Sequence, residues 1–162
     1  MRSCFISCRR LPRREAARGF TLPELMVVVT VLGVLLSIGV PSFQSIIIGQ
    51  RLKNASFEVY SALVLARSEA ISRNAAVTIT PTAGDWTNGW TVASGATVIR
   101  KQDTYPNITI NGPLSIGFNA MGRTTGAAAQ QISLTATGTS SPAFRCINID
   151  LSGRPRTKNG TC

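Results

Sequence analysis

The feature that most constrains this chain is an apolar run near its N-terminus, from Phe20 to Val40 (FTLPELMVVVTVLGVLLSIGV). The run carries one charge, on Glu24. As a helix it would extend about 31 Å, which matches the hydrocarbon core of a bilayer. Residues 1–19 hold six arginines and one glutamate, and this excess of positive charge favours retention of this end in the cytoplasm. We therefore expect one transmembrane helix with the N-terminus inside and the C-terminus outside.

A cleavable secretory signal peptide is the competing interpretation of this run. Such a peptide has a shorter apolar core, of about 7–15 residues, and ends in small residues, as Ser37 and Gly39 would provide. The observed run is longer. A carboxylate inside a membrane span is also energetically expensive and indicates a functional role for Glu24.

The residues around Glu24 resemble a known processing motif. Gly19–Leu25 (GFTLPEL) is similar to the class III signal of type IV prepilins and pseudopilins. The resemblance implies that prepilin peptidase cuts between Gly19 and Phe20 and methylates the new N-terminus. It also makes Glu24 the fifth residue of the processed chain. There the carboxylate would meet the N-terminal ammonium of a neighbouring subunit and set the register of assembly.

Beyond Pro41 the pattern remains compatible with a helix to about Arg73. Apolar residues recur at spacings of three and four, which predicts an amphipathic spine continuous with the span. These residues are Leu52, Ala55, Val59, Ala62, Leu63, Ala66 and Ala70.

From Ala75 onward, glycine, proline, threonine and serine become frequent and the helical periodicity stops. Short β-prone runs alternate with turn residues, which predicts strands. The runs are 76–80, 89–93, 97–101, 108–110, 116–118, 131–136 and 145–151, with a hairpin turn at Ser94-Gly95. The expected fold class is α+β, with the long N-terminal helix packed on an antiparallel β-sheet head, as in pilins.

We predict three parts along the chain. Residues 1–19 form a leader that is removed, and residues 20–47 form the transmembrane and assembly half of the helix. Residues 48–162 form a periplasmic head in which the helix continues to about 73. A C-terminal disulfide loop spans 146–162.

Two further stretches carry a resemblance to one branch of this family. Ile116–Gly126 (IGFNAMGRTTG) is similar to the F-x-x-x-G-R-x-T-G stretch of GspH/FimT proteins. Asp85–Trp90 (DWTNGW) resembles the D-W-x-x-G-W feature of the same branch. The resemblance is strongest to FimT-type minor pilins. A purely structural role is the alternative, with a glycine at a turn and tryptophans filling the seam between helix and sheet.

Cys146 and Cys162 form a late, isolated pair in a domain that we expect to be exported. Such a pair predicts a disulfide, and two free thiols are the alternative. A bond between them would close a loop of 15 residues. That closure would stabilise the fold by about 3 kcal/mol.

The predicted loop contains a basic segment, Gly153-Arg154-Pro155-Arg156, followed by Lys158. Pro155 favours an extended chain in which Arg154 and Arg156 share one face and suit successive phosphates, while glycine permits close backbone approach. The segment is similar to the G-R-x-R tail through which FimT-type minor pilins capture DNA. The resemblance implies that Gly153, Arg154, Arg156 and Lys158 bind double-stranded DNA without sequence preference. A merely solubilising tail is the alternative.

Four other cations would widen this patch if the fold placed them nearby: Arg100, Lys101, Arg123 and Arg145. The net charge of +10 also favours anionic partners such as nucleic acid or lipid headgroups.

Catalysis is disfavoured by the composition. Histidine is absent, which removes the commonest general base and the commonest zinc ligand. The sequence has no cysteine–base pair, phosphate-binding loop or metal-spaced carboxylates. We expect no catalytic residues, no metal site and no cofactor.

The sequence and its resemblances predict a minor pilin of a type IV pilus, assembled into the fibre and binding DNA during natural transformation. The alternative is a GspH-like minor pseudopilin of the type II protein secretion system. Expected partners are other pilins or pseudopilins, prepilin peptidase, the inner membrane and DNA. The expected location is the bacterial inner membrane, single-pass with a periplasmic C-terminus, and then the pilus or pseudopilus.

Overall fold

The computed structural model describes residues 20–137 and 143–162, without the side chains of residues 38 and 40–42. The predicted leader, including Gly19, therefore lies outside the described residues. The chain divides into two compact units, Met1–Gly39 and Val40–Cys162. The boundary predicted at 47/48 falls inside the second unit.

One long helix, α1, runs from Leu22 to Arg73. It ends at Asn74, whose φ of 49° lies in the left-handed region. The N–H groups of Asn74 and Ala75 donate to the carbonyls of Ile71 and Ala70, both at 3.2 Å. This pattern satisfies the last carbonyls of the helix and stops it. The predicted end at about Arg73 is confirmed.

In the part of the chain that the structure describes, we find no helix with the length and apolar character needed to cross a membrane.

The predicted apolar stripe of the spine is confirmed in the second unit. Its residues are all buried, from Leu52 at one end to Ala70 at the other. The small side chains Ala55, Ala62 and Ala66 are fully enclosed, so the backbone of α1 lies close to the strands beneath it.

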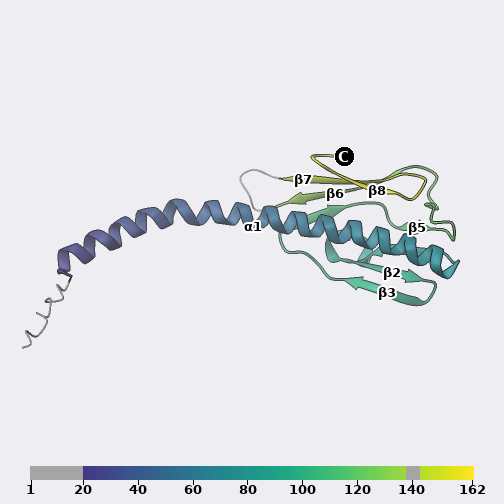
Figure 1. Ribbon diagram of the computed structural model, residues 1–162, viewed down its shortest axis with the longest axis horizontal. Helices are drawn as coiled ribbons and strands as arrows, with labels where there is room; N and C mark the ends of the chain where they lie inside the picture. Colours follow the sequence, from purple (N-terminus) through teal and green to yellow (C-terminus); the bar gives the residue numbers. More distant parts are fainter. Residues whose placement is uncertain (1–19, 138–142) are drawn as a thin grey trace, which may run out of the picture. The chain divides into compact units, whose positions relative to one another are not determined.

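The described residues of the head form two four-stranded antiparallel sheets rather than one (Figure 1). The first, in the order β3-β2-β1-β5, is made of β1 (Val77–Pro81), β2 (Trp90–Ser94), β3 (Thr97–Gln102) and β5 (Ile116–Phe118). The second, in the order β4-β6-β7-β8, is made of β4 (Ile108–Asn111), β6 (Gln130–Ala136), β7 (Phe144–Ile149) and β8 (Pro155–Asn159). Two short 3-10 turns, η1 (Thr82–Gly84) and η2 (Trp86–Asn88), precede β2.

One hydrophobic core joins α1 to both sheets. Figure 1 shows the head part of α1 lying across them, with β6, β7 and β8 on one side and β2 and β3 on the other. Trp86 and Trp90 are 2% and 1% exposed, and their ring centroids are 6.1 Å apart. Trp86 Nε1 donates to the Pro113 carbonyl at 2.7 Å. The tryptophans thus fill the interior, as the structural alternative expected.

The predicted strands are largely confirmed, with two differences. The hairpin between β2 and β3 pairs Ser94 with Thr97, so its turn residues are Gly95 and Ala96 rather than Ser94 and Gly95. The eighth strand, β8, lies in the segment expected only to be extended. It pairs with β7 from Ile149–Pro155 to Arg145–Asn159 and forms an edge of the second sheet.

Candidate functional site

The C-terminal cations lie on the hairpin formed by β7 and β8. Arg156 pairs with Asn148, and Lys158 pairs with Cys146. Because successive side chains of a strand point to opposite faces, Arg156 and Lys158 share one face of the second sheet. Both residues are exposed.

Asp150 organises the turn that joins β7 to β8. Its carboxylate accepts a hydrogen bond from the Ser152 hydroxyl at 2.6 Å and one from the Arg154 backbone N–H at 3.0 Å. These hydrogen bonds, that of the Ser152 hydroxyl first, lower the pKa of the Asp150 carboxyl. The Asp150 carbonyl accepts the N–H of Gly153 at 2.9 Å. The turn therefore fixes the backbone of Arg154 where β8 begins.

Gly153 is buried and packs against the backbone of Gly122. A Cβ at Gly153 would lie 2.1 Å from the Gly122 carbonyl oxygen, and the φ of Gly153 is +79°. Only glycine fits this contact without strain. The structure thus gives Gly153 a packing role inside the head. Its predicted contact with DNA stays a prediction.

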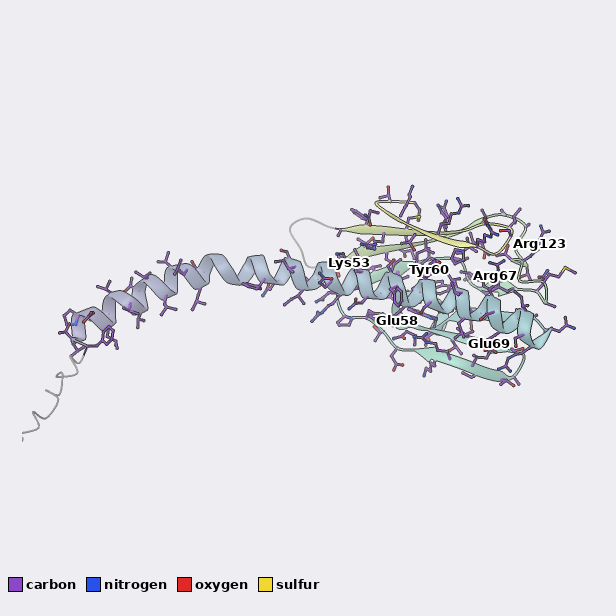
Figure 2. All side chains as sticks on the ribbon, viewed as in Figure 1. Lys53, Glu58, Tyr60, Arg67, Glu69 and Arg123 are labelled. Carbon is purple, nitrogen blue, oxygen red and sulfur yellow. A yellow bond between two sulfur atoms is a disulfide. The ribbon has the colours of Figure 1, made fainter. Side chains whose placement is uncertain are left out.

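The segment around Gly122 connects the hairpin turn to α1. Arg67 Nε donates to the Gly122 carbonyl at 2.9 Å. Asn119 Oδ1 accepts from the N–H groups of Met121 and Arg123, each at 3.0 Å. Figure 2 shows Arg67 and Arg123 at the same end of the head. The two glycine-arginine segments, around Gly122 and Gly153, are therefore neighbours in the fold.

Arg154 and Arg156 line one shallow hollow of about 360 Å³, together with Gln131, Asn148 and Asp150. Arg154 is exposed, like Arg156. Arg156 also interacts electrostatically with Asp150 and contributes to its lowered pKa. In the described parts of the chain, the side chains of Arg154, Arg156 and Lys158 form no ion pair. Their donors are free for an anionic partner.

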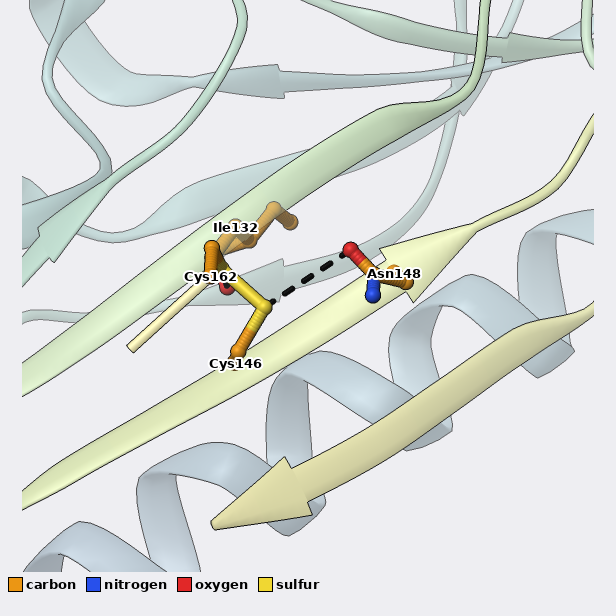
Figure 3. The surroundings of a disulfide bond; sticks show 4 residues. All are labelled: Ile132, Cys146, Asn148 and Cys162. Carbon is orange, nitrogen blue, oxygen red and sulfur yellow. Dashed lines mark hydrogen bonds between the residues drawn. A yellow bond between two sulfur atoms is a disulfide. The ribbon is translucent and has the colours of Figure 1, made fainter. Parts of the chain in front are cut away.

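The predicted disulfide is confirmed between Cys146 and Cys162 (Figure 3). Cys146 is buried in β7, and its Cα lies 5.0 Å from that of Cys162. The Cys162 Sγ lies 3.5 Å from the carbonyl oxygen of Ile132 in β6. The segment that follows β8 is thus attached to the middle of the second sheet.

The other four cations divide between the two sheets. Arg100 and Lys101 lie on β3, and Arg100 forms an ion pair with Glu58 of α1. Arg123 and Arg145 belong to the C-terminal region instead. The Cα of Arg123 would lie 3.4 Å from a Cβ at Gly153, and Arg145 pairs with Asn159. Of these two, only Arg123 lies beside the turn that carries Arg154. Arg145 is one position before Cys146, the residue opposite Lys158, so its side chain points to the other face of the sheet, toward α1.

A groove of about 820 Å³ separates α1 from the end of the second sheet. Lys53, Phe57 and Tyr60 of α1 line one wall, and Arg145 and Arg156 line the other. Figure 2 labels Lys53 and Tyr60 on this part of α1. Sequence reasoning missed this groove. Its signal was an aromatic residue, Phe57, that falls outside the buried stripe of the helix.

In the first unit, Phe20 precedes α1, which begins at Leu22, and Glu24 lies in the first turn of the helix. Phe20 is 75% exposed. The Thr21 N–H donates to Glu24 Oε2 at 3.4 Å. Thr21-x-x-Glu24 therefore forms half of a capping box at the start of α1. The sequence pattern S/T-x-x-E could have indicated this contact.

Among residues 20–137 and 143–162, no group of three or more His, Cys, Asp or Glu side chains could hold a metal ion.

Two family models match this chain. The model described as type II transport protein GspH matches residues 55–153. The prokaryotic N-terminal methylation motif matches residues 15–40. Because the first match covers more than half of the sequence, the chain belongs to the GspH family.

Two solved structures of the type IV minor pilin FimU from Pseudomonas aeruginosa (strain PAO1) share this fold. Each is 25% identical to the chain, with TM-scores of 0.60 and 0.58. The first comparison covers 69% of this chain and 94% of that chain, and the second covers 67% and 97%. The comparison with curated proteins gives no match.

These findings confirm a GspH/FimT-type pilin of the α+β class. The chain is a type IV minor pilin or pseudopilin, and the family and fold are those of structural pilins. The family implies assembly with other pilins and processing by prepilin peptidase, and the methylation motif implies membrane anchoring and pilus assembly.

Proposed function

We propose that this chain is a minor pilin of a type IV pilus whose C-terminal hairpin binds double-stranded DNA without sequence preference during natural transformation. Arg154, Arg156 and Lys158 contact phosphates, and Gly153 holds the turn that presents them. Arg123, beside Gly153, extends the contact surface.

The observation that carries this proposal is a set of exposed cations on and next to β8, an edge strand of the second sheet. Arg156 and Lys158 lie on β8, which is paired to β7 and tied back by the Cys146–Cys162 disulfide. None of the three proposed phosphate ligands forms an ion pair with another described residue. Exposed cations that form no ion pair with another described residue are suited to a polyanion.

The N-terminal residues carry the assembly part of the proposal. Prepilin peptidase cuts between Gly19 and Phe20, and Glu24 then pairs with the N-terminal ammonium of a neighbouring subunit. Residues 20–47 anchor the chain in the inner membrane as a single pass, with the head, residues 48–162, in the periplasm. Exposed apolar side chains on the first unit support this anchoring: Leu22, Leu25, Met26, Val27, Val28, Val29, Val31, Leu32, Val34, Leu35 and Leu36.

A mobility-shift titration of the full chain in neutral detergent tests the DNA proposal. Arg154→Gln/Arg156→Gln should weaken duplex binding at low salt and lower the slope of log K against log[salt] by about 2. The matched control is Arg51→Gln/Lys101→Gln, which removes the same charge from α1 and β3. Equal binding by the two double variants, or no binding by the parent, would exclude the hairpin as a DNA site.

A minor pseudopilin of the type II secretion system is the second candidate, and the description of the matching GspH family favours it. The similarity to FimU over nearly the whole length of that chain favours the pilus. Deleting the gene in its own host separates the two functions. Loss of transformation and pilus-dependent motility with normal exoprotein secretion supports the pilus, and the reverse supports secretion.

A further inference from the structure

The groove between α1 and the C-terminal hairpin carries charge of one sign. Lys53, Arg145 and Arg156 line it, and no carboxylate of the described residues does. Among the described residues these three side chains form no hydrogen bond or ion pair. Glu58, the acid nearest in sequence to this part of α1, is instead paired with Arg100 of β3. The groove is therefore suited to an anionic ligand.

Two aromatic rings stand in the same groove. Phe57 is 67% exposed although it belongs to the helix that carries the core, and Tyr60 is partly exposed. The two residues are three positions apart on α1, so their side chains are neighbours on one helix face. No hydrogen bond holds the Tyr60 hydroxyl to another described residue. The rings provide flat apolar surfaces beside the cations.

Ser56 adds a polar group at the base of the groove. The residue is only 2% exposed, yet it lines the groove and makes no hydrogen bond to another described residue. Its hydroxyl oxygen is not among the buried side-chain atoms that lack a partner, so it is open to the groove and available to a polar atom of a ligand.

We propose that this groove binds single-stranded DNA. Lys53, Arg145 and Arg156 contact its phosphates, and Phe57 and Tyr60 stack on unpaired bases. A positively charged channel with aromatic platforms is how sequence-tolerant proteins hold single strands. In a duplex the base faces are already stacked, so a duplex makes no use of the rings.

The inference rests on the DNA-binding function proposed above and extends it. Arg156 lines both the groove and the hollow that contains Arg154. A strand that leaves a duplex held at the hairpin, at a frayed end or an overhang, therefore enters the groove next to a shared arginine. An acidic peptide would satisfy the cations but would leave the rings without a stacking partner.

Fluorescence anisotropy of labelled oligo(dT) with the full chain in neutral detergent tests the inference. Phe57→Ala/Tyr60→Ala should weaken oligo(dT) binding by about 25-fold or more, because each of the two stacked bases contributes about 5-fold or more. Binding of a duplex of equal length should stay within about twofold, because the phosphate contacts remain. Phe57→Leu/Tyr60→Leu keeps the apolar surface without the rings and should show the same selective loss.

The matched control is Val64→Ala, which truncates another exposed apolar side chain of α1 that does not line the groove. It should leave oligo(dT) binding unchanged. Unchanged oligo(dT) affinity in the aromatic variants, or no oligo(dT) binding by the parent, overturns the inference. Displacement by polyglutamate as effective as displacement by unlabelled oligo(dT) also overturns it, because the groove would then be an acidic-peptide site.

Arg154→Gln separates this inference from the proposed function, since Arg154 lines the hollow and not the groove. If the duplex binds the parent and Arg154→Gln alike, the hairpin proposal fails. Selective loss of oligo(dT) binding in the aromatic variants would still support the groove in that case. Conversely, duplex binding that depends on Arg154, with no effect of the rings on oligo(dT), keeps the hairpin and removes the groove.

Discussion

The carbonyl oxygen of Gly122 occupies the space that a Cβ of Gly153 would take, at 2.1 Å. This contact joins the loop after β5 to the turn before β8, and Arg67 of α1 donates to the same carbonyl. One peptide group thus connects the helix, the first sheet and the C-terminal hairpin.

Gly153→Ala should destabilise the head by about 3 kcal/mol or more, because it adds a backbone clash to an unfavourable positive φ. Gly160→Ala is the matched control. Gly160 also has a positive φ, +99°, but open space around its Cβ position. Its substitution should cost only about 1–2 kcal/mol. Urea unfolding measures both, and equal losses would contradict the packing role of Gly153.

Cys146→Ser/Cys162→Ser should lower stability by about 3 kcal/mol and the Tm by roughly 10 °C. The reason is that the bond closes a loop between residues that are 16 apart in sequence. Reductant should produce a similar drop in the parent and none in the double variant. If reductant leaves the Tm of the parent unchanged, the disulfide does not stabilise the head.

Trp86→Phe should destabilise the head by about 1 kcal/mol more than Trp90→Phe. Both substitutions remove similar buried volume. Only Trp86 loses a hydrogen bond, to the Pro113 carbonyl, because Trp90 Nε1 has no partner among the described residues. Thermal unfolding followed by circular dichroism measures the difference. Equal losses would show that the bond to Pro113 contributes nothing.

Asp150 should titrate below its ordinary value of 3.8, because the Ser152 hydroxyl and the Arg154 N–H stabilise its carboxylate. Since its folded pKa is the lower one, its stabilising effect is present above the unfolded pKa. That effect is lost as the pH falls through the folded pKa. Carbon-13 NMR of the carboxyl follows the titration directly. In Ser152→Ala the midpoint should rise toward 3.8, and an unchanged midpoint would contradict the assigned cause.

Glu24→Gln separates the hydrogen bond that this carboxylate accepts from Thr21 from its proposed ion pair with a neighbouring subunit. Glutamine still accepts a hydrogen bond from the Thr21 N–H, so the helix start is kept. It carries no charge for a neighbouring N-terminal ammonium. We expect Glu24→Gln to be cleaved normally but to enter filaments as poorly as Glu24→Ala. Quantitative immunoblotting of sheared filaments measures this, and normal incorporation of the glutamine variant would refute the ion-pair role.

The helix and its buried face were predictable because one physical pattern determines them. Apolar residues from Leu52 to Ala70 repeat with the helical period, and each lies in the core. The end at Arg73 followed from the loss of that period. The disulfide was predictable because two cysteines in a segment that is expected to be exported have few alternatives.

The strand β8 was not predictable from its own residues. Pro155–Asn159 alternates no apolar side chains, and the strand exists because β7 offers an edge with free hydrogen-bonding groups. A periodic apolar pattern predicts a strand only where the strand buries side chains, and β8 buries very few. The division into two sheets was equally hidden. β5 follows β4 in sequence, but β4 belongs to the second sheet and β5 pairs with β1 of the first.

The groove could not be found from the sequence because its walls are distant in the chain. Lys53 and Arg145 belong to α1 and β7, and only the packing of the second sheet on the helix places them in one groove. The tail arginines were visible as a motif, but the burial of Gly153 between two loops was not. A glycine in a basic segment suggests access for a ligand, whereas here its small size accommodates Gly122.

The attachment of Cys162 to β7 has a mechanical consequence. An edge strand with a loose end unzips under load one hydrogen-bonded pair at a time, starting from that end. Here both ends of β8 are connected to β7. One end is connected through the turn at Asp150, and the other through the Cys146–Cys162 disulfide, so a pulling force on Arg154 or Arg156 acts on a strand without a loose end. β7 lies between β6 and β8, so the load passes into the interior of the sheet and rupture requires shearing several pairs together.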